Sequence, residues 1–351
     1  MKIVHTITTD VAVLGGGPAG VGAGLAAVRA GARTLLIEQY GFLGGMAAAA
    51  LALPWRYRQE TALLPEFEEI LARCRTLGVC AAPFPDYADA NSRLILLDPE
   101  TIKYALQEQV LAAGVDLLLH AKVIILRRVQ QRIVTAIIHC REGGVSVRAT
   151  AFIDATGTGA FCRGNSPVPL AYSFVVADLP RLRNSGQDLG GYFACFLQQR
   201  EALQRVLPDH GLARLQEEQP EFRAVQNVCF DPAWRSGELL IHLLFAPPVS
   251  PEEAAALTHA ELRGQALSHR LVEYFRKQVA GFETARILMT PAQVGLRRPW
   301  QVPETVDAGN LLVAGRHALP PSPDAAWTSL APHTFASGVA AGQRAAAIAG
   351  I

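Results

Sequence analysis

The sequence has little net charge and no long apolar run. Its 351 residues carry 32 Lys and Arg against 31 Asp and Glu, for a formal charge of +1. This balance leaves no basic surplus that would draw the chain to nucleic acid. The longest apolar stretches, such as residues 42–54, are shorter than the roughly 20 residues that a bilayer-spanning helix needs. We therefore expect a globular protein with no nucleic-acid partner and no membrane span.

The cysteines also lack the patterns that carry function. There are six, and none forms a CxxC pair or a regular spacing. We expect neither a disulfide framework nor a metal site, which is typical of a reducing compartment. Lys2 is followed directly by a strand-like segment with polar breaks at residues 6–10, unlike a removable leader. A cytoplasmic location is the expectation.

A strand, a glycine turn, a helix and a second strand open the chain. Val11–Leu14 is an apolar run that ends in glycines, and Thr34–Ile37 is a second run that stops at Glu38. Between them, Pro18–Ala30 predicts a helix of small residues that ends at Gly31. The right-handed crossover rule makes the two strands parallel.

Residues 98–155 predict a helix followed by several strands. Asp98 and Pro99 are typical of the N-cap and the first helical position. Gly114 ends this helix, and residues 115–119 predict a strand. Turn signals then separate three runs that predict an inserted antiparallel meander: Lys122–Val129, Ile133–Cys140 and Val145–Thr150. Ala151–Ala155 predicts a return to the parallel sheet.

The segment 166–285 differs in character from both ends. It contains several prolines, a Gln- and Glu-rich helical stretch at 198–221 and an amphipathic helix around 258–279. Residues 310–351 return to a strand, Leu311–Ala314, a glycine turn and a helix of small residues. The predicted fold class is α/β: a discontinuous Rossmann-like domain (residues 1–165 and 286–351) with the antiparallel meander insert, and a smaller α+β cap domain (residues 166–285).

The strongest motif is the glycine turn after the first strand. Gly15 allows a tight turn, Gly17 lets the backbone approach a pyrophosphate, and Gly20 lets the helix pack closely on the sheet. The helix N-terminus offers N–H groups and a partial positive charge to phosphates. Glu38, at the end of the second strand, can accept hydrogen bonds from a ribose diol. Together these residues predict a dinucleotide site.

Two further glycine turns favour FAD over NAD. Gly157 and Gly159 follow the strand 151–155, and Gly315 follows the strand 311–314. A long dinucleotide stretched over one domain needs several close backbone approaches, and the isoalloxazine of FAD lies far from its adenine. An NAD-dependent dehydrogenase would use only the first motif and is the disfavoured alternative.

Several short segments also match a family pattern. They are Asp10–Gly20, Ile37–Ala47, Asp98–Glu100 with Lys103, Phe152–Gly157, Gly281–Glu283, Leu311–Arg316 and Phe335–Gln343. Through them the chain resembles the FAD-dependent oxidoreductase family of the glutathione-reductase-like flavoprotein superfamily. The resemblance covers both ends and the middle of the chain and is poor between about residues 165 and 240.

The resemblance implies a set of FAD contacts. The segment 44–46 would pass along the pyrophosphate and ribitol, and Val123 would touch the adenine. The second and third glycine turns and the start of the last helix, residues 338–342, would approach the flavin. The expected cofactor-binding residues are Gly15, Gly17, Pro18, Ala19, Gly20, Glu38, Gln39, Gly44, Gly45, Met46, Val123, Ala155, Thr156, Gly157, Gly315, Arg316, Gly338 and Ala341.

Four basic side chains are the candidate catalytic residues. Family members tend to carry Arg-Glu-Ser-Arg where this chain has Arg297-Arg298-Pro-Trp, so the substrate class is not carried over. Arg297 and Arg298 would bind a carboxylate or stabilise charge on the reduced flavin; the alternative is a surface pair. His333 would relay protons or hydrogen-bond at a helix start. His317 would face the isoalloxazine.

Other conspicuous side chains receive structural interpretations. Arg56 and Arg58 are interpreted as part of a solvated loop, and Cys162 as a small buried hydrophobe. Trp55 and Tyr172 are interpreted as core or interface residues rather than as the wall of a substrate pocket.

The resulting functional hypothesis is an FAD-dependent oxidoreductase. It would transfer a hydride between a small-molecule substrate and flavin N5, with a further electron donor or acceptor that the sequence does not identify. The alternative is a flavin-binding subunit or regulatory module without substrate chemistry of its own. The sequence does not indicate the oligomeric state.

Overall fold

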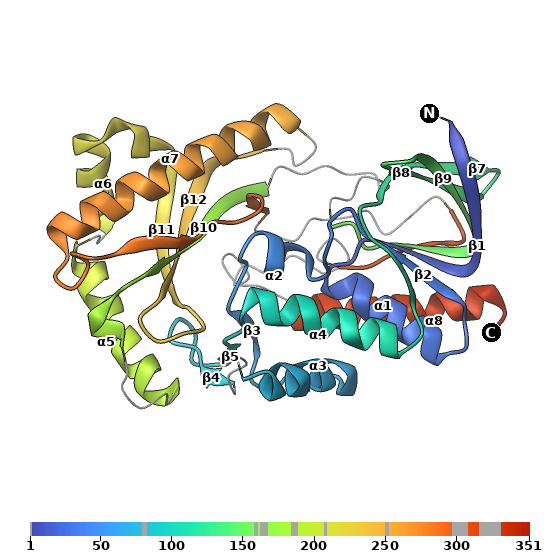
Figure 1. The fold of residues 1–351 in the computed structure, drawn as a ribbon, viewed down its shortest axis with the longest axis horizontal. Coiled ribbons are helices and arrows are strands. Elements are labelled where there is room, and N and C mark those ends of the chain that lie inside the picture. Colours follow the sequence, from blue (N-terminus) through green and yellow to red (C-terminus); the bar gives the residue numbers. More distant parts are fainter. Residues whose placement is uncertain are drawn as a thin grey trace.

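The computed structural model describes residues 2–78, 83–157, 161, 168–183, 189–206, 209–249, 253–296, 308–315 and 331–351. Two regions lie side by side along the longest axis (Figure 1). One contains both chain ends and is built on a main sheet. The other contains the middle of the chain and is built on a second sheet, here called the cap sheet. The α/β class predicted from the sequence is confirmed.

The main sheet has the Rossmann-like order β6-β2-β1-β9-β8-β7. In addition, β15 pairs with the C-terminal end of β9. Strands β1, β2, β6, β9 and β15 run parallel, whereas β7 and β8 form an antiparallel hairpin that pairs with β9. The bounds are β1 Ile3–Leu14, β2 Thr34–Ile37, β6 Asp116–Leu118, β7 Lys122–Val129, β8 Arg132–Cys140, β9 Gly143–Asp154 and β15 Leu311–Val313.

The meander is less separate from the sheet than the sequence suggested. Its expected third strand and the expected returning strand are one continuous strand, β9, which pairs with β1 from Gly144 to Asp154. No glycine or proline interrupts residues 145–154, so nothing in the chain forces a turn there. The hairpin β7–β8 therefore extends the main sheet.

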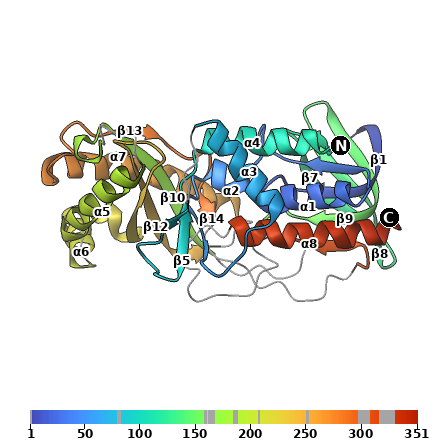
Figure 2. The same cartoon turned by 90° about the horizontal axis from the view of Figure 1, so that it is seen from below.

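Helices cover the main sheet through unusually close contacts. The most extensive contact between two helices joins α1 (Pro18–Arg29) and α8 (Ala331–Ala349), which lie side by side in Figure 2. A Cβ placed on Gly338 would lie 1.9 Å from the carbonyl oxygen of Ala19, and one on Gly342 would lie 2.3 Å from that of Ala23. These glycines let the two helix backbones touch. The other helices here are α3 (Pro65–Thr76) and α4 (Pro99–Ala112).

The N-cap of α4 is the one expected from the sequence. The Asp98 side chain accepts a hydrogen bond from the backbone N–H of Glu100 at 2.8 Å, and Pro99 is the first helical residue. An N-cap of this kind stabilises a helix by about 1 kcal/mol.

The cap sheet has the order β11-β12-β10-β13, and β14 also pairs with β10. Its strands are β10 Val168–Ala177, β11 Val225–Pro232, β12 Leu239–Val249, β13 Arg286–Met289 and β14 Gly295–Leu296. The helical segments of this region are η1 Pro180–Leu182, α5 Leu189–Val206, α6 Asp209–Glu218, η2 Pro220–Ala224 and α7 Ala254–Gln278. Because β13 and β14 pair with β10, residues 286–296 lie with the cap sheet, whereas the sequence placed the return to the Rossmann-like domain at residue 286.

The two faces of the cap sheet have different neighbours. On β10, Tyr172 and Phe174 share a core with the cap helices. Val175, on the opposite face, and Leu240 of β12 belong instead to the core cluster that contains α1 and α8. The alternation of side chains along a strand thus turns one face of the cap sheet toward the main-sheet region. The expected core placement of Tyr172 agrees with this.

A small sheet and a short helix lie at the junction of the two regions (Figures 1 and 2). The small sheet consists of β3 (Trp55–Arg58), β4 (Phe84–Pro85) and β5 (Ser92–Ile95), in the order β3-β5-β4. The helix, α2 (Gly45–Ala49), directly precedes this segment. The sequence predicted no element in residues 55–95. Within the described residues, no helix is both long and apolar enough to cross a membrane.

Candidate FAD site and a buried polar network

The first glycine turn has the geometry that its sequence predicts. Gly15 has φ +110°, and a Cβ on it would lie 2.5 Å from the Ala155 carbonyl oxygen. A Cβ on Gly20 would lie 1.7 Å from the Gly15 carbonyl oxygen, so the close approach of α1 to β1 requires glycine there. Gly17 is different, because the nearest atom to a Cβ would be 3.8 Å away. Protein packing therefore explains the first and third glycines but leaves the second to be explained by a ligand.

The start of α1 is also open to a ligand. Gly17 is the N-cap and makes no side-chain cap hydrogen bond, and Pro18 is the first helical residue. A helix N-terminus without a side-chain cap presents N–H groups to an anion such as a pyrophosphate.

Glu38 lies beside this turn. Its carboxylate accepts hydrogen bonds from the N–H groups of Gly16 at 2.6 Å and Tyr40 at 2.8 Å. The side chain is buried, and burial raises its pKa although the backbone N–H groups lower it. A carboxylate has about four acceptor sites, so at least one stays available for a further donor. Glu38 can therefore hold a ribose hydroxyl without losing its backbone contacts. The neighbouring Gln39 is exposed.

The segment 44–46 folds back against the glycine turn. The Gly44 N–H donates to the Gly16 carbonyl oxygen at 2.9 Å, and a Cβ on Gly45 would lie 2.9 Å from the Gly17 Cα. Gly44 and Gly45 both have positive φ, at +113° and +52°, which favours glycine at these positions. The structure thus brings the segment expected to follow the pyrophosphate next to the turn expected to bind it.

The second and third glycine turns lie at the ends of neighbouring strands. The buried Asp154 ends β9, and its carboxylate accepts from the Thr156 N–H at 3.0 Å and the Thr156 hydroxyl at 2.7 Å. Gly157 follows with φ +70°, and a Cβ on it would meet nothing within 4 Å. Gly315 follows β15 with φ +101°, and its N–H donates to the Ser337 hydroxyl at 2.8 Å. Since β1, β9 and β15 are adjacent and parallel, the three turns share one edge of the main sheet.

The remaining predicted residues fall into three groups. Gly338 packs against α1, as described above, and Ala341 is buried in the same core cluster, so packing accounts for their small size. Val123 is half-buried on β7. The candidates Arg297, Arg298, Arg316 and His317 lie outside the described residues, and so does Cys162, which was interpreted as a small buried hydrophobe.

His333 is the one described catalytic candidate. It lies in the first turn of α8 and is half-buried, and burial lowers the pKa of its imidazole. Its Nδ1 atom is buried and has no hydrogen-bond partner in the described structure. Burial therefore favours the neutral imidazole, the form that can take up a proton.

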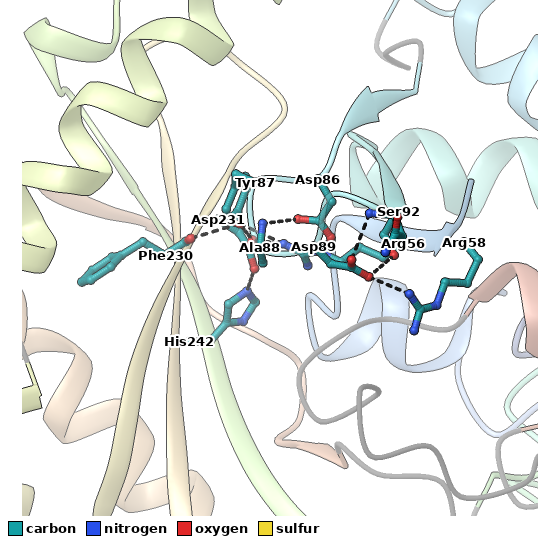
Figure 3. A network of polar contacts seen from close by, with 11 residues as sticks. Arg56, Arg58, Asp86, Tyr87, Ala88, Asp89, Ser92, Phe230, Asp231 and His242 are labelled. Carbon is teal, nitrogen blue, oxygen red and sulfur yellow. Dashed lines mark hydrogen bonds and ion pairs between the residues drawn. The ribbon is translucent and has the colours of Figure 1, made fainter. Parts of the chain in front are cut away.

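The structure also contains a buried polar network that the sequence analysis missed (Figure 3). Arg56 was interpreted as part of a solvated loop, and this was wrong: it is only 6% exposed. Its Nε atom donates to Asp86 at 2.8 Å, and its Nη2 atom donates to Tyr87 at 2.8 Å and to Asp231 at 2.5 Å. Tyr87 also donates to Asp231. Partners 30 to 175 residues away in the sequence replace the water that an arginine usually keeps.

The network continues across the cap sheet. Asp231 on β11 contacts His242 Nε2 on β12 at 2.9 Å, and His242 Nδ1 lies 2.7 Å from the Ser173 hydroxyl on β10. Burial alone would raise the pKa of Asp231, but Arg56 and His242 lower it to about 2. Burial alone would likewise lower the pKa of Arg56, but the charges of Asp231 and Asp86 raise it. The network holds the small sheet against the face of the cap sheet that is turned toward the main-sheet region.

The local geometry fits FAD. Three open or positive-φ glycine positions lie on one sheet edge, an uncapped helix start faces the first of them, and a buried carboxylate lies beside it. Within the described part of the chain, no cluster of three or more His, Cys, Asp or Glu side chains is arranged to bind a metal ion.

Comparison with known proteins supports the same cofactor. Residues 10–168 match the model of the family described as "FAD dependent oxidoreductase". The resemblance seen in the sequence is thereby confirmed, and the chain is an FAD-dependent enzyme of the oxidoreductase class. A search of curated proteins found no match.

Solved structures share the fold at low identity. A geranylgeranyl bacteriochlorophyll reductase-like protein from Thermoplasma acidophilum has 14% identity and a TM-score of 0.57, over 98% of this chain and 78% of that one. OxyS anhydrotetracycline hydroxylase from Streptomyces rimosus has 14% identity and a TM-score of 0.56, over 97% of this chain and 62% of that one. p-Nitrophenol 4-monooxygenase PnpA from Pseudomonas putida DLL-E4 has 17% identity and 0.53, over 98% and 80%. At these identities the likeness concerns the fold.

Proposed function

We propose that the chain binds a small molecule between the cap sheet and the FAD-binding region and transfers a hydride between that molecule and the flavin. The observation that carries the proposal is that one face of the cap sheet is turned toward the main-sheet region. This face, which includes Val175 and Leu240, packs in the same core as α1 and α8. The first turn of α1 follows the first glycine turn, and Ser337 of α8 accepts a hydrogen bond from the Gly315 N–H. A substrate held at this junction would lie within reach of the flavin end of the cofactor.

The residues of this chain would supply position and proton control. FAD, when bound, supplies the hydride-accepting or hydride-donating N5 atom. His333 is a candidate for holding the proton that accompanies hydride transfer, because its imidazole favours the neutral form and its Nδ1 atom has no partner within the described residues. The buried Arg56 network would fix the cap sheet relative to β3.

Rapid anaerobic mixing with a panel of small metabolites tests the proposal. The expected result is that one substrate class reduces the bound flavin with a saturable rate, and that His333→Gln slows this step by about 10²-fold. If no compound reduces the flavin, or if all of them reduce it slowly at rates that neither saturate nor differ between compounds, the proposal is contradicted and the flavin-binding module is favoured. The cytoplasmic location stays a prediction.

A further inference from the structure

The short helix α2 is held at both ends by other parts of the chain. It has only five residues, and its N-cap, Gly44, makes no side-chain cap hydrogen bond. Isolated helices of this length are unstable, and their last carbonyl groups need partners outside the helix. At the N-terminal end, Gly44 and Gly45 lie against the dinucleotide-binding turn. The position of α2 therefore bears directly on the cofactor site.

The partner at the other end comes from the cap. Residues 290–294, here called the cap loop, connect β13 and β14. The backbone N–H groups of Ala292 and Gln293 both donate to the carbonyl oxygen of Ala49, at 2.7 and 3.2 Å. Ala49 is the last residue of α2, so the cap loop satisfies a carbonyl group that the helix leaves open.

The Gln293 side chain adds a second contact. Its Oε1 atom accepts a hydrogen bond from the Tyr40 hydroxyl, and its Nε2 atom donates to Met46 Sδ at 3.3 Å. Burial and the nearby charge of Glu38 raise the pKa of Tyr40 to about 12, so its hydroxyl keeps its proton. The amide thus bridges the segment after β2 and the second residue of α2.

The cap loop is itself fixed to the cap. The Val294 N–H donates to the Glu261 carboxylate on α7, and β14 pairs with β10 in the register Ala171 to Gly295. Movement of the cap sheet would therefore move the cap loop, and through it α2.

We propose that Gln293 is a positioning residue for FAD, and that the cap loop couples the docking of the cap to cofactor binding by holding α2 in place. When a contact keeps a protein in its binding-competent conformation, its loss raises the apparent dissociation constant in inverse proportion to the fraction of molecules that stays competent. The coupling is reciprocal, so bound FAD must stabilise the cap loop to the same extent.

The contacts that the cap loop makes with α2 and Tyr40 are here called the clamp. Titration of FAD into apoprotein, followed by flavin fluorescence, tests the clamp. Gln293→Ala and Tyr40→Phe should each weaken FAD binding about three- to tenfold, the effect of one or two hydrogen bonds. The double variant should be no weaker than the worse single one, because both remove the same bridge. Gln265→Ala is the matched control. Gln265 is exposed on α7, so this variant should bind FAD like the wild type.

Hydrogen exchange and thermal unfolding complete the test. FAD should slow amide exchange in residues 286–296 of the wild type and do so less in Gln293→Ala, while the melting temperature of the apoprotein stays near that of the control. FAD dissociation constants within twofold of the wild type in both variants would overturn the proposal. So would weaker binding that only follows a fall in apoprotein stability. Tyr40→Phe keeps the aromatic ring and serves as the readout if Gln293→Ala does not fold. The clamp concerns cofactor binding alone, so its failure would leave the hydride-transfer proposal standing.

Discussion

The Arg56 network makes a quantitative prediction about stability. Replacing Arg56 with Met keeps an apolar stem but removes the guanidinium that contacts Asp86 and Asp231. Both carboxylates are buried, so the substitution leaves negative charge without its main partner. Removing one member of a buried ion pair typically costs 3–5 kcal/mol, and we expect Arg56→Met to lower the free energy of unfolding by about 4 kcal/mol.

The loss should depend on pH in a defined direction. In the wild type, Asp231 has a pKa of about 2, so its contribution to stability is present above pH 3.8 and is lost only as the pH falls through about 2. Without Arg56, burial raises the pKa of this carboxyl group. The folded variant then takes up a proton that the folded wild type does not. The difference in free energy of unfolding between the two proteins should therefore become smaller as the pH falls from 7 toward about 4.

Urea unfolding of the two proteins at several pH values is the assay. Arg33→Met is the matched control, because Arg33 pairs with Asp10 at 2.7 Å on the surface, where its side chain is 69% exposed. Exposed pairs contribute about 0–1 kcal/mol, so the control should unfold almost like the wild type. A loss below about 1 kcal/mol for Arg56→Met, or one that does not change with pH, would refute the reasoning.

Two further predictions concern other packed positions. Burial raises the pKa of Glu238 from 4.5 to about 7, so its stabilising contribution is full below pH 4.5 and is lost as the pH rises through 7. Glu238→Gln should remove this loss. At pH 8 the variant should unfold at a higher urea concentration than the wild type, with a free energy of unfolding larger by at most about 3 kcal/mol. At pH 4 the two proteins should unfold alike. Gly338→Ala places a Cβ 1.9 Å from the Ala19 carbonyl oxygen and should cost about 1–3 kcal/mol, measured by thermal unfolding of the apoprotein. An unchanged melting temperature would mean that α1 and α8 are not packed as closely as described.

Local patterns predicted the cofactor region well. The first helix begins at Pro18, as predicted, because a glycine turn and a proline mark its start in the sequence. The strand Thr34–Ile37 also has its predicted bounds. The Asp98 N-cap is a signal of the same kind. Each depends on residues within a few positions of one another, which is the range over which sequence patterns act.

Features that depend on distant partners were not predicted. The sequence around Arg56 is typical of a solvated arginine. No local pattern predicts that Asp86 and Asp231 contact its side chain in the fold. Gly338 is a second example, since its missing side chain is explained by contact with Ala19 on a helix more than 300 residues away in the sequence. The small strands at 55–58, 84–85 and 92–95 are too short to show a clear alternation.

Binding of FAD to Gly17→Ala tests the central claim most directly. The backbone of Gly17 has φ −71°, which alanine adopts easily, and the nearest atom to the added Cβ is 3.8 Å away. The apoprotein should therefore melt within about 4 °C of the wild type, the most that alanine at an N-cap costs. FAD binding should weaken about tenfold or more because the methyl group occupies the place of the pyrophosphate. FAD binding equal to that of the wild type would contradict the claim that this turn holds the cofactor.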